Sequence, residues 1–231
     1  MARTIFFLAT CLFLTSSANA EALPDLGIIG AAYDGRNIWL NSSGEFAGSY
    51  YDGNVVRWDR ENNTKEEFLP VAEYPDLEVN DITAKEVDDV WFATNSGVMH
   101  YDDGTWDVFT VEDGLETNDV IDVALDSTGV VWVATRYWDN ENNGEIQISS
   151  YSDNTWNTVK RFPGMLGGLI AIDKNNIKWF SVSNVLKWFS ISNELYRYDG
   201  TSWSAITSEE ITSASTIGGG SIESLMFDHD N

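Results

Sequence analysis

Two short segments combine aromatic and hydrogen-bonding side chains in a way that suits the binding of a polar ligand. Tyr50 and Tyr51 are adjacent in the first segment, and the second has Arg136, Tyr137 and Trp138 before an acidic, asparagine-rich run. Aromatic faces stack on the apolar faces of sugar rings, while amide, carboxylate and guanidinium groups bond the hydroxyls. These residues predict recognition of a neutral or cationic polar ligand, with a glycan as the favoured class. The alternative, that paired surface aromatics pack on their own loop, is equally compatible with the sequence.

A third candidate segment comes from a local duplication. The run Lys-Trp-Phe-Ser-Val-Ser-Asn at 178–184 is repeated as 187–193, with Ile in place of Val. Either copy can form the apolar strand that this part of the chain requires. Lys187 and Trp188 are therefore candidates for ligand binding and, in the alternative register, for the core. The sequence leaves the register of 178–193 open.

Catalytic and metal-binding patterns are poorly represented. The chain has two histidines, His100 and His229, and one cysteine, Cys11, so a metal site or a Ser-His-Asp triad has few possible members. No nucleophile elbow, phosphate-binding loop, dinucleotide fingerprint or zinc-protease motif occurs. The run 139–144 begins like a calcium loop, but Ser150 stands where that loop needs an acid. We therefore expect a non-enzymatic protein with no catalytic residues, metal or cofactor.

The first 20 residues have the pattern of an export signal. Arg3 precedes an apolar stretch from Ile5 to Leu14, and Ala18-Asn19-Ala20 is a typical cleavage site. The apolar stretch is shorter than the ~20 residues of a membrane-spanning helix, and no later run reaches that length. We expect export to the periplasm or the extracellular space, without membrane insertion by this segment.

The charge of the chain argues against two classes of partner. Thirteen basic residues stand against 37 acidic ones, which gives a net charge of −24. Loss of Arg3 with the signal would make the chain more acidic still. A field of this sign repels nucleic acids and anionic membrane surfaces, so we expect neither as a partner.

The elements that must position the candidate residues follow from a repeat rich in tryptophan. A short apolar strand with a central tryptophan precedes an aromatic residue, a turn and a second tryptophan. That aromatic residue stands at positions 58, 101, 151 and 198, so the period is 43 to 50 residues. Such a period, with four short strands per unit, is typical of β-propeller blades. We expect six recurring tryptophans to lie in the core: Trp91, Trp106, Trp132, Trp156, Trp179 and Trp203.

The repeat divides the chain into an incomplete propeller. After the signal at 1–20, residues 21–231 are expected to form blades at about 27–70, 79–111, 119–162 and 166–209, with the start of a fifth at about 219–231. The predicted fold class is all-β, a propeller of four-stranded blades with about four blades and the first strand of a fifth. The chain would then be a fragment of a larger propeller. No helix is expected beyond the signal.

The repeat resembles that of the two-component regulator propeller family. Residues 101–135 read YDDGTWDVFTVEDGLETNDVIDVALDSTGVVWVAT, close to the family pattern of YDG-x-x-W, DGL-x-x-N-x-V and D-x-x-G-x-x-W-x-G-T, and 173–181 and 198–203 are similar. The resemblance is strong over 79–231 and weak over 27–70, and Lys85 replaces an aspartate of the pattern. It implies an extracytoplasmic propeller that binds a ligand, either in a hybrid sensor kinase or in a secreted protein. It transfers no functional residue.

Function is expected where the repeat is interrupted. Between the second-strand tryptophan and the third-strand aromatic residue, the first, third and fourth units have nine more residues than the second. In the first and third units we expect these insertions to be loops after strands at 37–42 and 130–135. In propellers such loops open on the same face as the segments that join the blades. The insertions contain the candidate residues of the first and third units.

These features favour a non-enzymatic sensor or secreted binding protein for a small polar ligand or glycan. One alternative is a propeller enzyme, a lyase or hydrolase acting on polysaccharide. Another is a structural module for interactions at the cell surface. In the sensor interpretation the full-length protein continues into further blades and signalling or sorting domains.

Overall fold

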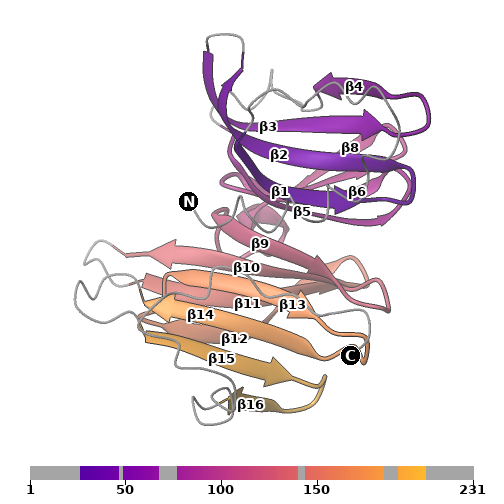
Figure 1. Ribbon diagram of the computed structural model, residues 1–231. Helices are drawn as coiled ribbons and strands as arrows, with labels where there is room; N and C mark the ends of the chain where they lie inside the picture. Colours follow the sequence, from indigo (N-terminus) through magenta and orange to yellow (C-terminus); the bar gives the residue numbers. More distant parts are fainter. Residues whose placement is uncertain (1–26, 47–48, 68–76, 140–143, 185–191, 207–231) are drawn as a thin grey trace, which may run out of the picture.

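The structure is a computed structural model that describes residues 27–46, 49–67, 77–139, 144–184 and 192–206. Each of its four sheets has four antiparallel strands in chain order (Figure 1). The predicted signal at 1–20 and the start of a fifth blade at 219–231 lie outside the described residues. Within them, no helix is long and apolar enough to span a membrane.

The strands form four blades. Blade 1 contains β1 (Gly27–Tyr33), β2 (Asn37–Phe46), β3 (Ser49–Asp59) and β4 (Thr64–Glu67). Blade 2 contains β5 (Val79–Glu86), β6 (Asp89–Thr94), β7 (Gly97–Asp102) and β8 (Thr105–Phe109). Blade 3 contains β9 (Val120–Leu125), β10 (Val131–Trp138), β11 (Gly144–Ser152) and β12 (Thr155–Pro163). Blade 4 contains β13 (Gly167–Ile172), β14 (Lys178–Asn184), β15 (Ser192–Tyr198) and β16 (Trp203–Ile206).

Two details differ from the sequence-based expectations. The insertions of blades 1 and 3 are not plain loops, because the ladders continue into them: Glu45 pairs with Tyr50, and Trp138 with Gly144. The continued backbone pairing satisfies polar groups that a loop would leave to water. A single 3-10 turn, η1 (Val111–Asp113), also lies between blades 2 and 3, where no helix was expected.

The first strands of consecutive blades lie side by side, in the order β1, β5, β9 and β13 (Figure 1). Three hydrophobic cores separate the blades, one at each junction. This face-to-face packing of short sheets, with the first strands innermost, is propeller architecture. The predicted fold class is confirmed.

In blades 1, 2 and 3 the second-strand tryptophan packs against a third-strand tyrosine of the next blade. Three ring pairs have centroids 5.7, 5.7 and 5.9 Å apart: Trp39–Tyr101, Trp91–Tyr151 and Trp132–Tyr198. The fourth-strand tryptophans face the opposite way and join the core shared with the preceding blade: Trp106, Trp156 and Trp203. Each junction therefore receives one wide ring from either side.

The expected core tryptophans are not equally covered. Three of them are buried: Trp91, Trp132 and Trp156. The other three are half-buried: Trp106, Trp179 and Trp203. Trp39, which belongs to the weakest repeat in the sequence, is fully buried. Its burial shows that blade 1 is a full member of the array.

An aspartate in the turn between the first and second strands orients the tryptophan in three blades. The indole Nε1 donates to this carboxylate at 2.7, 3.4 and 3.1 Å in three pairs: Trp39–Asp34, Trp132–Asp126 and Trp179–Asp173. Each carboxylate also accepts backbone N–H groups of its own turn. Burial opposes the ionisation of Asp173, but the bonds from Ile177 and Trp179 lower its pKa below the ordinary value.

Blade 2 keeps the tryptophan in place with different groups. Lys85 occupies the position of the turn aspartate, and Trp91 instead stacks on His100 with ring centroids 3.8 Å apart. Asp89 supplies a carboxylate to both neighbours: its Oδ1 lies 2.8 Å from His100 Nε2, and its Oδ2 lies 3.2 Å from Lys85 Nζ. The substitution at Lys85 is thus compensated locally.

A pair of carboxyl groups, of half-buried Asp81 and buried Asp122, links the innermost strands of three blades. Asp81 Oδ2 accepts the backbone N–H of Val123 at 3.3 Å, and Asp122 Oδ2 accepts that of Ile170 at 2.9 Å. Burial raises the pKa of Asp122 well above its ordinary value, and the charge and hydrogen bond of Asp81 raise it further. Asp122 is therefore held as the neutral acid over a wider pH range than an exposed aspartate.

We predict that Trp132→Ala lowers the free energy of unfolding by about 3–5 kcal/mol, because it leaves a cavity between blades 3 and 4. Trp138→Ala is the control, since this side chain is 43% exposed and its loss should change stability by only ~0.5 kcal/mol. Denaturant unfolding of both variants measures the difference. Equal losses would contradict the assignment of Trp132 to the inter-blade core.

We also predict opposite pH dependences for two aspartates. The folded pKa of Asp122 is raised, so its contribution to stability is complete below the ordinary pKa of 3.8 and is lost as the pH rises through the folded pKa. Asp122→Asn keeps an acceptor for Ile170 and should remove this loss, so its stability relative to the parent should rise as the pH increases above the ordinary pKa of 3.8. The folded pKa of Asp173 is lowered, so its carboxylate contributes stability above the ordinary pKa. The stability of Asp173→Asn relative to the parent should therefore fall as the pH rises. Unfolding at several pH values measures both trends, and parallel curves for the two variants would refute the prediction.

Candidate ligand-binding site

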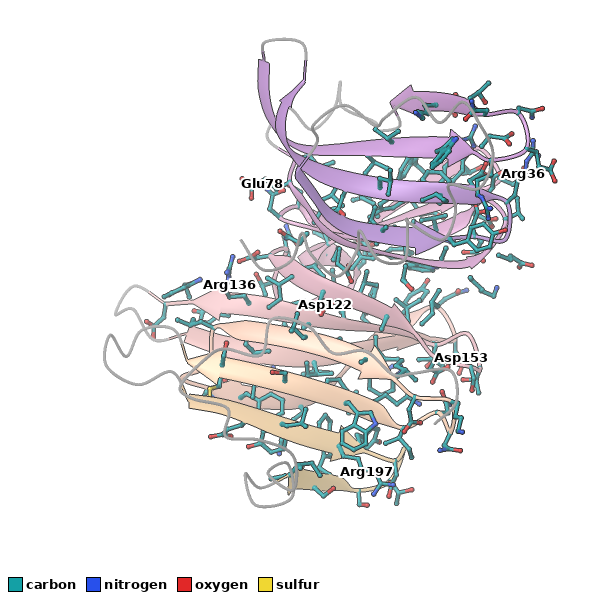
Figure 2. The ribbon with its side chains drawn as sticks, in the orientation of Figure 1. Arg36, Glu78, Asp122, Arg136, Asp153 and Arg197 are labelled. Atoms are coloured by element: carbon teal, nitrogen blue, oxygen red, sulfur yellow. The ribbon has the colours of Figure 1, made fainter. Side chains whose placement is uncertain are left out.

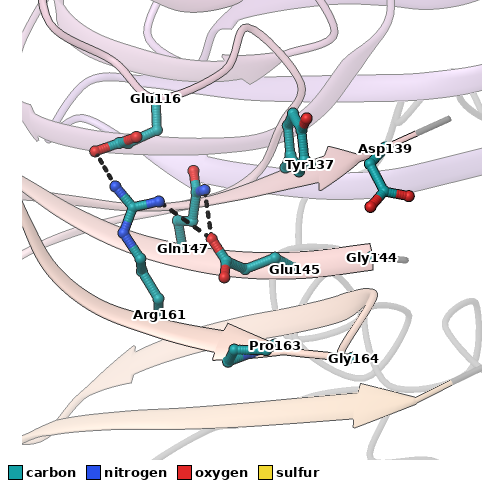
Figure 3. Close-up of a pocket in the computed structure, with 9 residues that line it drawn as sticks. All are labelled: Glu116, Tyr137, Asp139, Gly144, Glu145, Gln147, Arg161, Pro163 and Gly164. Atoms are coloured by element: carbon teal, nitrogen blue, oxygen red, sulfur yellow. Dashed lines mark hydrogen bonds and ion pairs between the residues drawn. The ribbon is translucent and has the colours of Figure 1, made fainter. Parts of the chain in front are cut away.

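Blade 3 carries an open pocket of about 480 Å³ where β10 ends, β11 begins and β12 ends (Figure 3). Its lining residues are Glu116, Tyr137, Asp139, Gly144, Glu145, Gln147, Arg161, Pro163 and Gly164. The first of these comes from the segment that joins blades 2 and 3. The pocket therefore lies on the face where the insertion of blade 3 and the inter-blade segments open, the face on which a ligand was expected.

A three-residue ion network forms one wall. Arg161 reaches between two carboxylates, with Nη2 2.6 Å from Glu116 Oε1 and Nη1 3.2 Å from Glu145 Oε1 (Figure 3). Gln147 Nε2 also donates to Glu145 Oε1, and Thr158 Oγ1 donates to Glu116 Oε1, both at 2.7 Å. The network fixes each side chain from two directions, so the wall is ordered before any ligand arrives.

The lining of the pocket has a net negative charge. Two carboxylates, of Glu116 and Glu145, share one guanidinium group, that of Arg161, and Asp139 also belongs to the lining. The hydrogen bond from Thr158 lowers the pKa of Glu116, burial opposes this, and Arg161 lowers it further. Glu116 therefore stays ionised at neutral pH, and an anionic ligand would meet an unfavourable field.

Close approach of the backbone shapes the end of the pocket. Gly164 donates its N–H to the carbonyl oxygen of Gly144 at 2.7 Å. A Cβ on Gly144 would collide with the side chain of Leu166, and Gly164 has φ +78° in the left-handed region. Glycine is required at both positions, one for space and one for conformation.

Of the predicted blade 3 residues, Tyr137 lines the pocket and its neighbours do not. The ring of Tyr137 is 47% exposed, so it is available for stacking. Trp138 is 43% exposed, but alternation along β10 directs it to the other face of the sheet. Arg136 is held by Asp119, with Nε 2.8 Å from Oδ2, and is not part of the lining.

The other predicted residues are not brought to this pocket. Tyr50 and Tyr51 lie in β3 within the extended hairpin of blade 1, and their side chains lie outside the description. Lys187 and Trp188 lie outside the described residues. The first copy of the duplication, 178–184, forms β14 and pairs with both β13 and β15, which settles the register that the sequence left open.

Lys178, at the start of β14, has a structural role between blades 3 and 4. Its Nζ lies 2.9 Å from Asp126 Oδ2 and 5.2 Å from the ring centroid of Trp132. Both charged side chains are almost fully buried. Burial would raise the pKa of Asp126, but the bonds from Lys178 and Thr128 hold it below the ordinary value. This copy of the lysine is therefore a core residue.

Nothing in the sequence pointed to four residues that form the polar wall of the pocket: Glu116, Glu145, Gln147 and Arg161. The turn Asp153-Asn154 fixes where the hairpin β11–β12 begins, and simple counting from it would place Lys160 opposite Gln147. A bulge between Ile148 and Ser149 shifts the register, so Arg161 is opposite Gln147 instead. No pattern in the sequence predicts this bulge.

No protein-family model and no curated protein sequence matches the chain. Solved structures do resemble it. The extracellular domain of the hybrid two-component system BT4673 from B. thetaiotaomicron is 15% identical, with a TM-score of 0.59 over 87% of this chain and 25% of that one. The corresponding domain of BT3049 is 14% identical, with a TM-score of 0.53 over 83% of this chain and 30% of that one.

The described chain is four blades of a β-propeller. A third solved structure, the GH74 enzyme of Niastella koreensis, also resembles the chain. The two are 15% identical, with a TM-score of 0.55 over 78% of this chain and 30% of that one. The chain thus spans a quarter to a third of the length of these proteins. The sensor domains among them have the fold that the repeat predicted, and at these identities the likeness concerns the fold alone.

We predict that Lys178→Met destabilises the protein by about 3–5 kcal/mol, because it leaves the carboxylate of Asp126 buried without its cation. The double variant Lys178→Met/Asp126→Asn should recover part of this loss, since no charge is then buried unpaired. Denaturant unfolding at neutral pH measures both. If the single variant is as stable as the parent, Lys178 is not a buried partner of Asp126.

Proposed function

We propose that this chain is the ligand-binding part of an exported sensor or secreted binding protein, and that the blade 3 pocket takes a polar ligand of the glycan class. The observation that carries the proposal is the combination of an open pocket, an ordered polar wall and an exposed aromatic ring at its edge. Carbohydrate sites need these three features, since hydroxyls are bonded by fixed polar groups while a ring stacks on the sugar.

The comparisons support export and sensing. Two of the similar structures are extracellular domains of hybrid two-component systems. The export pattern at residues 1–20 points to the same compartment. We infer that the whole protein continues into further blades and into signalling or sorting domains, because the chain matches only part of these larger proteins.

A second candidate is an enzyme acting on polysaccharide, which the similarity to the GH74 enzyme favours. General acid catalysis by a carboxyl group needs a raised pKa and access to the substrate. In the pocket, Glu116 has a lowered pKa, and Glu145 is held by Arg161. Asp122 has a raised pKa, but it is buried and bonded to the backbone of Ile170. These properties favour binding over catalysis.

A glycan array followed by calorimetry tests the proposal. We expect an oligosaccharide to bind the purified protein, and Tyr137→Ala to weaken its affinity roughly 3- to 10-fold through loss of stacking. Trp138→Ala is a matched control, because it removes a neighbouring aromatic side chain of similar exposure that does not line the pocket. Tyr51→Ala tests the alternative site in blade 1.

Two outcomes would overturn the proposal. One is that no glycan binds, which would favour a structural interaction module. The other is that Tyr137→Ala binds as tightly as the parent, which would place the site elsewhere. Release of reducing ends from a bound oligosaccharide would instead establish the enzymatic alternative.

A further inference from the structure

We propose that the blade 3 pocket selects a ligand with a protonated amino group beside its hydroxyls, which for a glycan means an amino sugar with a free amine. This inference rests on the proposed function and narrows its ligand class. The free hydrogen-bond acceptors of the wall, the aromatic ring and the charge of the lining all favour such a ligand.

The two glutamates each commit one oxygen to the wall. Glu145 Oε1 accepts from Gln147 and Arg161, and Glu116 Oε1 accepts from Thr158 and Arg161. Among the described residues, neither Oε2 atom accepts a hydrogen bond. Two carboxylate oxygens of fixed side chains are thus available to a donor, and an ammonium group offers three donors together with the matching charge.

The single positive charge of Arg161 does not balance the negative charge of the lining. Arg161 forms ion pairs with both glutamates, so one guanidinium group stands against two carboxylates. One cation between two anions leaves a negative charge that a second cation in the pocket could balance. An anionic sugar, such as a uronic acid, would have to displace these pairs.

The aromatic ring favours the same class of ligand. Tyr137 contributes an exposed face at the edge of the pocket, across from the ion network (Figure 3). A cation close to such a face gains an attraction that a neutral amide does not. The ring, like the carboxylates, therefore distinguishes an ammonium group from its acetylated form.

The test compares a glucosamine oligosaccharide with its fully N-acetylated counterpart of equal length, by calorimetry at about pH 6, below the pKa of an amine of this kind. The free-amine form should bind at least tenfold more tightly, and added salt should reduce this preference. Glu116→Gln and Glu145→Gln should each reduce the preference several-fold. Asp153→Asn is the charge-matched control, because it removes one negative charge from a turn at the opposite end of blade 3 (Figure 2).

Arg161→Gln provides the sharper test, because it frees both glutamates from their cation. It should raise the affinity for the free-amine oligosaccharide, whereas a role of the network in folding alone predicts a loss. Unfolding measurements establish that the variant is folded. Equal or tighter binding of the N-acetylated form overturns this inference but leaves the glycan site standing. Absence of binding by both oligosaccharides and by every glycan of the array overturns the proposed function as well.

Discussion

At each junction between described blades, the indole of a second-strand tryptophan lies against a tyrosine of the next blade, and the packing of the blades depends on that contact. A short four-stranded sheet has too little apolar surface to be stable alone, so each blade depends on its neighbours. Trp39, Trp91 and Trp132 fill successive junctions in the same way. The polar groups around them, the turn aspartates in three blades and Asp89 with His100 in the second, hold the rings in position.

The packing between blades restricts the residues in the middle of the strands, whereas the ends of the strands can vary in length and sequence. The insertions of blades 1 and 3 extend hairpins without disturbing the ladder behind them. The pocket of blade 3 uses this freedom, since its polar wall comes from strand ends and from one inter-blade segment. A rigid frame that carries variable edges is a general arrangement for binding sites on repeat folds.

Buried and exposed carboxyl groups have different surroundings in this protein. Buried carboxyl groups are compensated in different ways. Burial favours the protonated form of Asp122, and Lys178 supplies a cation to Asp126. Asp34 accepts hydrogen bonds from Trp39 and Asn37. The carboxyl groups at the surface give the protein its excess of negative charge. The pocket belongs to this second group, because Glu116 and Glu145 are partly exposed and share one arginine. The preference for neutral or cationic ligands that we propose for the pocket agrees with this excess of acidic groups.

The sequence by itself determined the all-β propeller fold and the burial of three recurring tryptophans, because packing residues must recur with the period of the structure they fill. It also drew attention to Tyr137, which lines the blade 3 pocket, since an aromatic residue in an insertion stands out from a repeat. Only the tertiary structure decided which copy of the duplication forms β14, because both copies are equally apolar and only pairing with β13 and β15 separates them. It alone brought Arg161 to Glu116 and Glu145. That contact depends on a one-residue bulge and on the approach of a neighbouring segment, and neither leaves a local signal in the chain.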